Sequence, residues 1–121
     1  MEPVPSNMRA TSLQRRQYER IPFSTSLEVK NLAAGWTCEG RSIDLSRSGI
    51  GFFAERFMPV GTRVRISIWI DGDGHKVLTH VGATVTRAQA EGGGGIMGAQ
   101  FDVALAPQGQ PALCAMVDGR S

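Results

Sequence analysis

Lysine is scarce in this chain of 121 residues, and long apolar runs are missing from it. Lysine occurs only as Lys30 and Lys76, whereas glycine occurs 15 times. Few lysines and many glycines argue against long surface helices and favour tight turns between strands. No stretch approaches the roughly 20 apolar residues of a membrane-spanning helix, and the N-terminus lacks the apolar region of a signal peptide. We therefore expect a cytoplasmic, strand-rich protein without membrane insertion.

Cysteine and histidine are equally scarce, which limits the chemistry that the chain can perform. Cys38 and Cys114 are far apart, and neither has a second Cys or His at metal-ligand spacing. In a reducing compartment, both are expected to be free thiols. The two histidines, His75 and His80, do not accompany a Ser or Cys nucleophile in a recognisable catalytic motif. The sequence therefore predicts neither an enzyme nor a metal site.

The net charge is small, but the charges are unevenly distributed. The formal charge of +2 argues against general binding of nucleic-acid polymers. Between residues 9 and 20, however, a single acid, Glu19, stands among Arg9, Arg15, Arg16 and Arg20. Guanidinium groups bind phosphate oxygens, or the O6 and N7 edge of guanine, in bidentate fashion. This segment is either a solvated leader or an arm that binds an anion.

Alternating apolar and polar residues indicate antiparallel strands. Residues 62–70 place Val64, Ile66, Ile68 and Ile70 on one face, and residues 76–88 do the same with Val77, Val81, Ala83 and Val85. The DGDGH turn between these two runs predicts a hairpin. Shorter strands are predicted at 26–31, 37–44, 49–54 and 96–104, and the four glycines at 92–95 are predicted to form a flexible loop.

Six such strands predict an all-β fold, a small six-stranded antiparallel β-barrel. The predicted barrel has a flexible basic arm before it and a short helix after it, which begins at Pro111 and buries Leu113, Met116 and Val117. We divide the chain into a flexible segment, 1–13, a barrel domain with the arginine arm, 14–118, and a tail, 119–121.

A second candidate binding segment, DLSRSG, runs from Asp44 to Gly49 at the junction of two predicted strands. The Asp44 carboxylate can accept hydrogen bonds from guanine N1 and N2, and the Ser46 hydroxyl can donate to a phosphate or base oxygen. Gly49 permits a tight turn that leaves backbone groups open to a ligand. Taken alone, the segment also fits a plain Asx or Ser turn.

Together, the two segments resemble the signature of the PilZ domain family of cyclic di-GMP receptors. The Arg-x-x-x-Arg part is Arg16 to Arg20, and the Asp-x-Ser-x-x-Gly part is formed by Asp44, Ser46 and Gly49. The resemblance continues in GIGFF, directly after the second motif, and in MGAQF at 97–101, and it covers roughly residues 14–118.

This resemblance implies a stand-alone bacterial receptor in which the arginines clasp cyclic di-GMP against the barrel. The implied ligand-binding residues are Arg15, Arg16, Arg20, Asp44, Ser46 and Gly49. The position of Arg15, just before the first motif, implies that the ligand binds as an intercalated dimer. The implied function is second-messenger signalling, in which the N-terminal arm changes conformation on binding and an effector protein, unidentified by the sequence, responds.

Two alternatives remain open. The first is a PilZ-like protein-interaction adaptor that does not respond to the nucleotide, although such an adaptor has no need of Arg16, Arg20 and Asp44 together. The second is a small oligonucleotide-binding barrel with a basic arm. Oligonucleotide binding would require exposed aromatic residues for base stacking, and only Trp36 and Trp69 are candidates.

Overall fold

The computed structural model describes residues 20–72, 75–105, 110–111, 113–114 and 117. Arg15, Arg16 and Met116 lie outside the described residues. The same holds for the segment 1–13 and the tail 119–121, so the proposed division of the chain into three parts stays a prediction.

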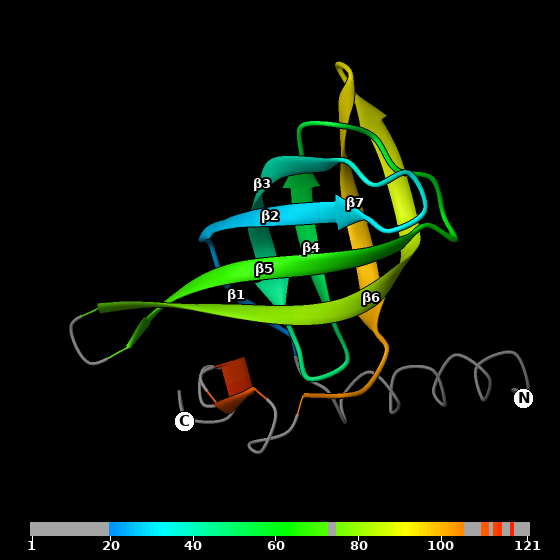
Figure 1. Cartoon of the computed structure of the whole chain (residues 1–121). Helices are drawn as coiled ribbons and strands as arrows, with labels where there is room; N and C mark the ends of the chain where they lie inside the picture. The colour runs from blue at the N-terminus through cyan, green and yellow to red at the C-terminus, as the bar shows by residue number, and fades with distance from the viewer. Residues whose placement is uncertain (1–19, 73–74, 106–109, 112, 115–116, 118–121) are drawn as a thin grey trace, which may run out of the picture.

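Seven antiparallel strands form one sheet that closes on itself (Figure 1). The strands are β1 (Ile21–Pro22), β2 (Ser26–Asn31), β3 (Thr37–Leu45), β4 (Gly49–Ala54), β5 (Arg63–Gly72), β6 (His75–Glu91) and β7 (Gly94–Phe101). Their order is β1-β3-β2-β5-β6-β7-β4, and β4 also pairs with β3. Strands β2 to β7 therefore make a closed six-stranded barrel, which confirms the predicted fold. The two-residue strand β1, which the sequence pattern did not predict, lies beside the end of β3.

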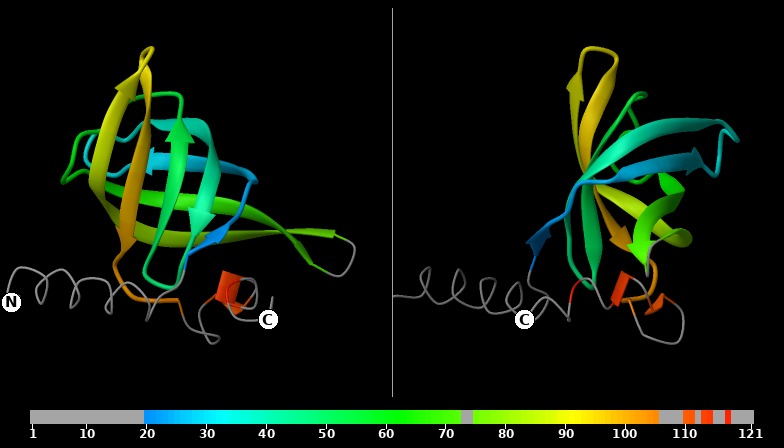
Figure 2. Two further views of the ribbon diagram at one scale, coloured as in Figure 1. Left: turned by 180° about the vertical axis from the view of Figure 1, so that it is seen from behind. Right: turned by 90° about the vertical axis from the view of Figure 1, so that its left-hand side faces the viewer.

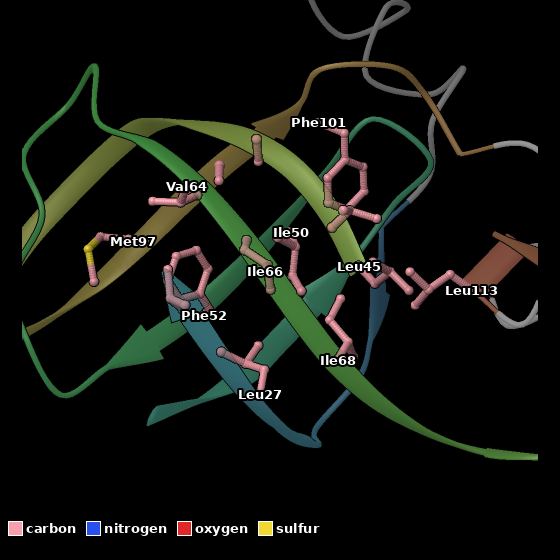
Figure 3. Packing of buried hydrophobic residues seen from close by; sticks show 14 of the residues in the cluster. Leu27, Leu45, Ile50, Phe52, Val64, Ile66, Ile68, Met97, Phe101 and Leu113 are labelled. Carbon is pink, nitrogen blue, oxygen red and sulfur yellow. The ribbon is translucent and has the colours of Figure 1, made fainter. Parts of the chain in front are cut away.

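The alternation of the strands fills the inside of the barrel with apolar side chains (Figure 3). On β5, the side chains of Val64, Ile66 and Ile68 are fully buried, as predicted, whereas Trp69 is exposed. Phe52 is the largest of the fully buried side chains. Because the inward positions of all the barrel strands contribute to one cluster, burial of this apolar surface is the main source of stability.

The β5–β6 hairpin extends beyond the body of the barrel (Figures 1 and 2). Pairing of β2 with β5 ends at Ile68, and pairing of β7 with β6 begins at Ala83. From Trp69 on β5 to Val81 on β6, the described strands of the hairpin pair only with each other. Val77 is consequently 41% exposed, although the alternation places it on the same strand face as Val81 and Val85, which are buried.

The four glycines at 92–95 form a tight turn and the start of β7 rather than a loop. Gly92 and Gly93 have φ values of 54° and 93°, in the left-handed region that favours glycine. Gly94 and Gly95 belong to β7, and a Cβ on Gly94 would lie 2.3 Å from the carbonyl oxygen of Ala54. The predicted four-residue loop is therefore wrong, because the last two glycines allow close approach between strands.

Helical residues after β7 cover the end of the barrel at which β3 turns into β4 (Figures 1 and 2). Pro111, Leu113, Cys114 and Val117 have helical conformation, and the last three are buried. The Cys114 amide donates to the carbonyl of Gln110 at 2.9 Å. These residues agree with the predicted short helix. Cys38 and Cys114 are both buried, and neither forms a disulfide bond among the described residues.

Candidate functional site

The segment that leads into the barrel is held along the second half of β3. In the β1–β3 ladder, Ile21 pairs with Leu45 and Pro22 pairs with Asp44. One residue further on, the Phe23 amide donates to the Ile43 carbonyl at 3.1 Å. Arg20 directly precedes Ile21, the first paired residue of β1. Because Pro22, two residues after Arg20, pairs with Asp44, Arg20 lies close to the Asp44 side chain.

The buried side chain of Ser42 on β3 holds this segment in place through hydrogen bonds. Its side chain is buried, its hydroxyl donates to the Phe23 carbonyl at 2.6 Å, and it accepts from the Thr25 amide at 2.9 Å. The Ser42 amide in turn donates to the Thr25 carbonyl at 2.9 Å. Ser42 was not predicted to have a role, although a polar side chain on the same strand face as Cys38 was a signal for buried hydrogen bonding.

Replacing Ser42 with alanine is expected to lower the free energy of unfolding by about 1–3 kcal/mol, because the Phe23 carbonyl and the Thr25 amide lose a buried partner. Urea denaturation measures this change. Ser26→Ala is the matched control, since Ser26 is an exposed serine on β2 and should change stability by less than about 0.5 kcal/mol. Equal stability of the two variants would contradict the anchoring role of Ser42.

A β-bulge in β3 turns Asp44 toward the outside of the barrel. Ser42 pairs with Phe52 and Asp44 with Gly51, so Ile43 is an extra residue on β3 relative to β4. A bulge of one residue reverses which side chains face inward beyond it. Leu45 therefore enters the core, where it is fully buried, and Asp44 stands on the outer face.

The Asp44 carboxylate, in the second sequence motif, contacts Arg20 of the first motif. Its Oδ1 atom accepts from Arg20 NH1 at 2.5 Å and from the Gly51 amide at 3.1 Å. The side chains of Arg20 and Asp44 are 43% and 32% exposed, so both remain accessible to a ligand. A carboxylate can accept about four hydrogen bonds, and Oδ2 has no partner among the described residues.

Gly51 on β4 provides the space in which this carboxylate lies. A Cβ on Gly51 would stand 2.8 Å from Asp44 Oδ1, which is too close for an unshifted side chain. Gly51 was not predicted to belong to the site, because a glycine in an alternating strand does not indicate which side chain lies over it.

Ser46 and Gly49 shape the turn that follows Asp44. The Ser46 side chain is buried. Its hydroxyl accepts from the amides of Ser48 and Gly49, both at 3.2 Å, and its own amide donates to the Gly49 carbonyl at 2.9 Å. A Cβ on Gly49 would lie 2.5 Å from the Ala99 carbonyl oxygen. In this conformation, both residues support the turn and the β4–β7 contact, and direct ligand contact by either stays a prediction.

The structure thus brings together part of the predicted site. Arg20 and Asp44 are in contact, and Ser46 and Gly49 form the adjoining turn. The described residues contain no group of three or more His, Cys, Asp or Glu side chains that could hold a metal ion. Their helical residues include no helix long and apolar enough to cross a membrane.

Comparison with known families identifies the class of protein that combines this barrel with this site. The profile of the PilZ domain matches residues 14–114. The chain therefore belongs to the PilZ domain family, as its two motifs suggested. No curated protein matches the chain by sequence.

Solved structures share the fold at low sequence identity. The inhibitor of motility MotI/DgrA from Bacillus subtilis has a TM-score of 0.69 at 19% identity, with 88% of this chain and 52% of that chain covered. The chain thus spans about half the length of MotI. The PilZ domain of YcgR from Escherichia coli, with c-di-GMP, has a TM-score of 0.62 at 23% identity, with 88% and 91% covered. The PilZ domain of CeSA from a cellulose-synthesizing bacterium has a TM-score of 0.57 at 24% identity, with 84% and 97% covered.

Proposed function

We propose that this protein is a cytoplasmic receptor for cyclic di-GMP, a binding protein rather than an enzyme. The ligand lies on the outer face beside Asp44, and the arginines of the segment before β1 close over it. Arg20 holds its place through Asp44, while Arg15 and Arg16 bind the phosphates and guanines. Ser46 and Gly49 present the turn at the edge of the site.

The observation that carries this proposal is the contact between Arg20 NH1 and Asp44 Oδ1 at 2.5 Å. The two residues are 24 positions apart in the chain, and each belongs to a different half of the family signature. A paired guanidinium and carboxylate offer donors and acceptors side by side, which suits a guanine that carries both. Membership of the PilZ family and the c-di-GMP in the YcgR structure support the same ligand.

Signalling requires a partner that distinguishes the bound from the free state. We propose that ordering of the N-terminal arm over the ligand creates this difference. The β5–β6 hairpin offers apolar side chains for a partner, since Trp69 and Leu78 are direct cross-strand neighbours and each is 38% exposed. The same surface would serve an adaptor that does not respond to the nucleotide, so ligand binding decides between the two functions.

Calorimetric titration of cyclic di-GMP into the protein tests the proposal. Heat is expected to saturate near two ligand molecules per chain, as an intercalated dimer requires. Arg16→Ala should lower the affinity at least about 10-fold, and remove the heat where several contacts are lost together, because charge-assisted hydrogen bonds contribute about 1.5–3 kcal/mol each. Arg9→Ala is the matched control, since Arg9 precedes the motif in the same basic segment.

Each outcome of the titration has a separate meaning. Saturation near one ligand molecule per chain would contradict binding of an intercalated ligand dimer, but would still support the function as a cyclic di-GMP receptor. Absence of heat, with NMR spectra unchanged by the ligand, would contradict the receptor and favour the nucleotide-independent adaptor. Equal losses in Arg9→Ala and Arg16→Ala would indicate general charge attraction instead of a defined clasp.

A further inference from the structure

One row of residues crosses the outer face of four strands and begins at Asp44. Asp44 on β3 pairs with Gly51 on β4, Gly51 pairs with Gly98 on β7, and Gly98 pairs with Arg87 on β6. Neighbouring strands lie about 4.8 Å apart. The four residues therefore stand side by side, with the two charged residues at the ends of the row.

A second bulge gives Arg87 its outward position. Val85 pairs with Ala99 and Arg87 with Gly98, so Thr86 is an extra residue on β6. Beyond the bulge the inward and outward positions are exchanged. Ala88 consequently packs against the core, and Arg87 is exposed on the outer face. The bulge at Ile43 does the same for Asp44 at the other end of the row.

The Arg87 guanidinium group lies back across the row instead of extending away from it. The position that a Cβ on Gly98 would occupy is 2.6 Å from Arg87 NH2, 2.8 Å from Nε and 2.9 Å from Cζ. The equivalent position on Gly51 is 2.8 Å from Asp44 Oδ1. The guanidinium and the carboxylate thus lie over directly paired glycines, and a ligand held by Asp44 lies within reach of Arg87.

The charge of Arg87 is not neutralised by a described carboxylate. In the part of the chain that the structure describes, the ion pairs are Arg20–Asp44 and Arg63–Asp102. Asp44 is therefore balanced by Arg20, and Arg87 adds an unpaired positive charge to the same face. An exposed guanidinium fork beside a neutralised pair suits a phosphate group, which accepts two parallel hydrogen bonds from it.

We propose that Arg87 is a further ligand-binding residue, which donates to a phosphate group of the cyclic dinucleotide held at Asp44. This inference rests on the proposed function, and it adds a residue on β6 to a site otherwise built from β3, β4 and the arm. The site then extends over both sides of Gly51. The ligand is bound by the barrel wall as well as by the arginines before β1.

Titration of cyclic di-GMP into Arg87 variants tests this role. Arg87→Ala is expected to weaken binding by about 10-fold to 100-fold, since it removes charge-assisted hydrogen bonds. Arg87→Lys should give an intermediate affinity, because it keeps the charge and loses the fork. Gly98→Ala is the second variant, whose Cβ displaces the guanidinium but keeps its charge, and it should also weaken binding. Arg65→Ala, at an exposed position on β5, is the matched control and should bind like the unchanged protein.

The salt dependence of affinity distinguishes a phosphate contact from a contact to a base. Loss of an ion contact should make the affinity of Arg87→Ala less sensitive to salt than that of the unchanged protein. An unchanged salt dependence would overturn the phosphate contact. If the unchanged protein binds the ligand and Arg87→Ala binds it equally well, this inference fails and the proposed function stands. If the unchanged protein does not bind, both fail together. Equal weakening in Arg65→Ala would also overturn a specific role for Arg87.

Discussion

Replacing Asp44 with alanine is expected to weaken the binding of cyclic di-GMP by about 100-fold to 1,000-fold. The carboxylate anchors Arg20 NH1 and has capacity for the N1 and N2 donors of a guanine. At the lower end of the usual range, about 1.5–2 kcal/mol each, loss of two hydrogen bonds to a charged group costs about 3–4 kcal/mol, which corresponds to this range of affinities. Calorimetric titration at constant salt concentration measures the change.

Asp44→Asn and Asp71→Ala complete this experiment. Asparagine keeps one oxygen acceptor but loses the charge that holds Arg20, so its affinity should fall between those of the alanine variant and the unchanged protein. Asp71 is an exposed acid on the β5–β6 hairpin, and its removal should leave the affinity unchanged. If the Asp44→Ala variant is folded and binds cyclic di-GMP with unchanged affinity, Asp44 is not a ligand-binding residue.

Replacing Phe52 with alanine is expected to lower the free energy of unfolding by about 3–5 kcal/mol. Among the described residues, Phe52 is the largest fully buried side chain, and it belongs to the apolar core cluster (Figure 3). Alanine would leave a cavity that close-packed neighbours fill only in part. Because small domains have a total stability of about 5–15 kcal/mol, this single change removes a large share of it.

Phe53 provides the matched control for this change. It is the next residue on β4, but its side chain faces outward and is 39% exposed. Phe53→Ala should therefore cost less than about 1.5 kcal/mol, since part of its surface already contacts water. Urea denaturation of both variants measures the difference. Equal losses would mean that the inward and outward faces of β4 have been assigned wrongly.

Strands with a regular alternation could be located from the sequence alone. β2 and β4 begin and end where the pattern predicted, and the buried face of β5 is the predicted one. The failures have physical causes that a local pattern does not contain. Val77 is apolar but lies on the overhanging hairpin, where it is exposed. Gly94 and Gly95 lie in a strand at positions where the neighbouring backbone leaves no room for a Cβ, so these positions require glycine.

The candidate site was predictable only in part, for a similar reason. Arg20 and Asp44 were found because they belong to a recognisable signature, and the structure places them in contact. Ser42, Gly51 and Arg87 could not be assigned without the register of the strands. The bulges at Ile43 and Thr86 decide which of these side chains share the outer face, and an alternating pattern does not reveal a bulge.

Backbone NMR spectra recorded during titration with cyclic di-GMP test whether the face beside Asp44 binds this ligand. If it does, the amide signals of Arg20, Asp44 and Gly51 should shift and saturate together, because these groups line the proposed binding face. Signals of the overhanging hairpin, such as that of Lys76, should stay in place. A spectrum unchanged by the ligand, or shifts confined to the hairpin, would contradict the claim that the face beside Asp44 binds cyclic di-GMP.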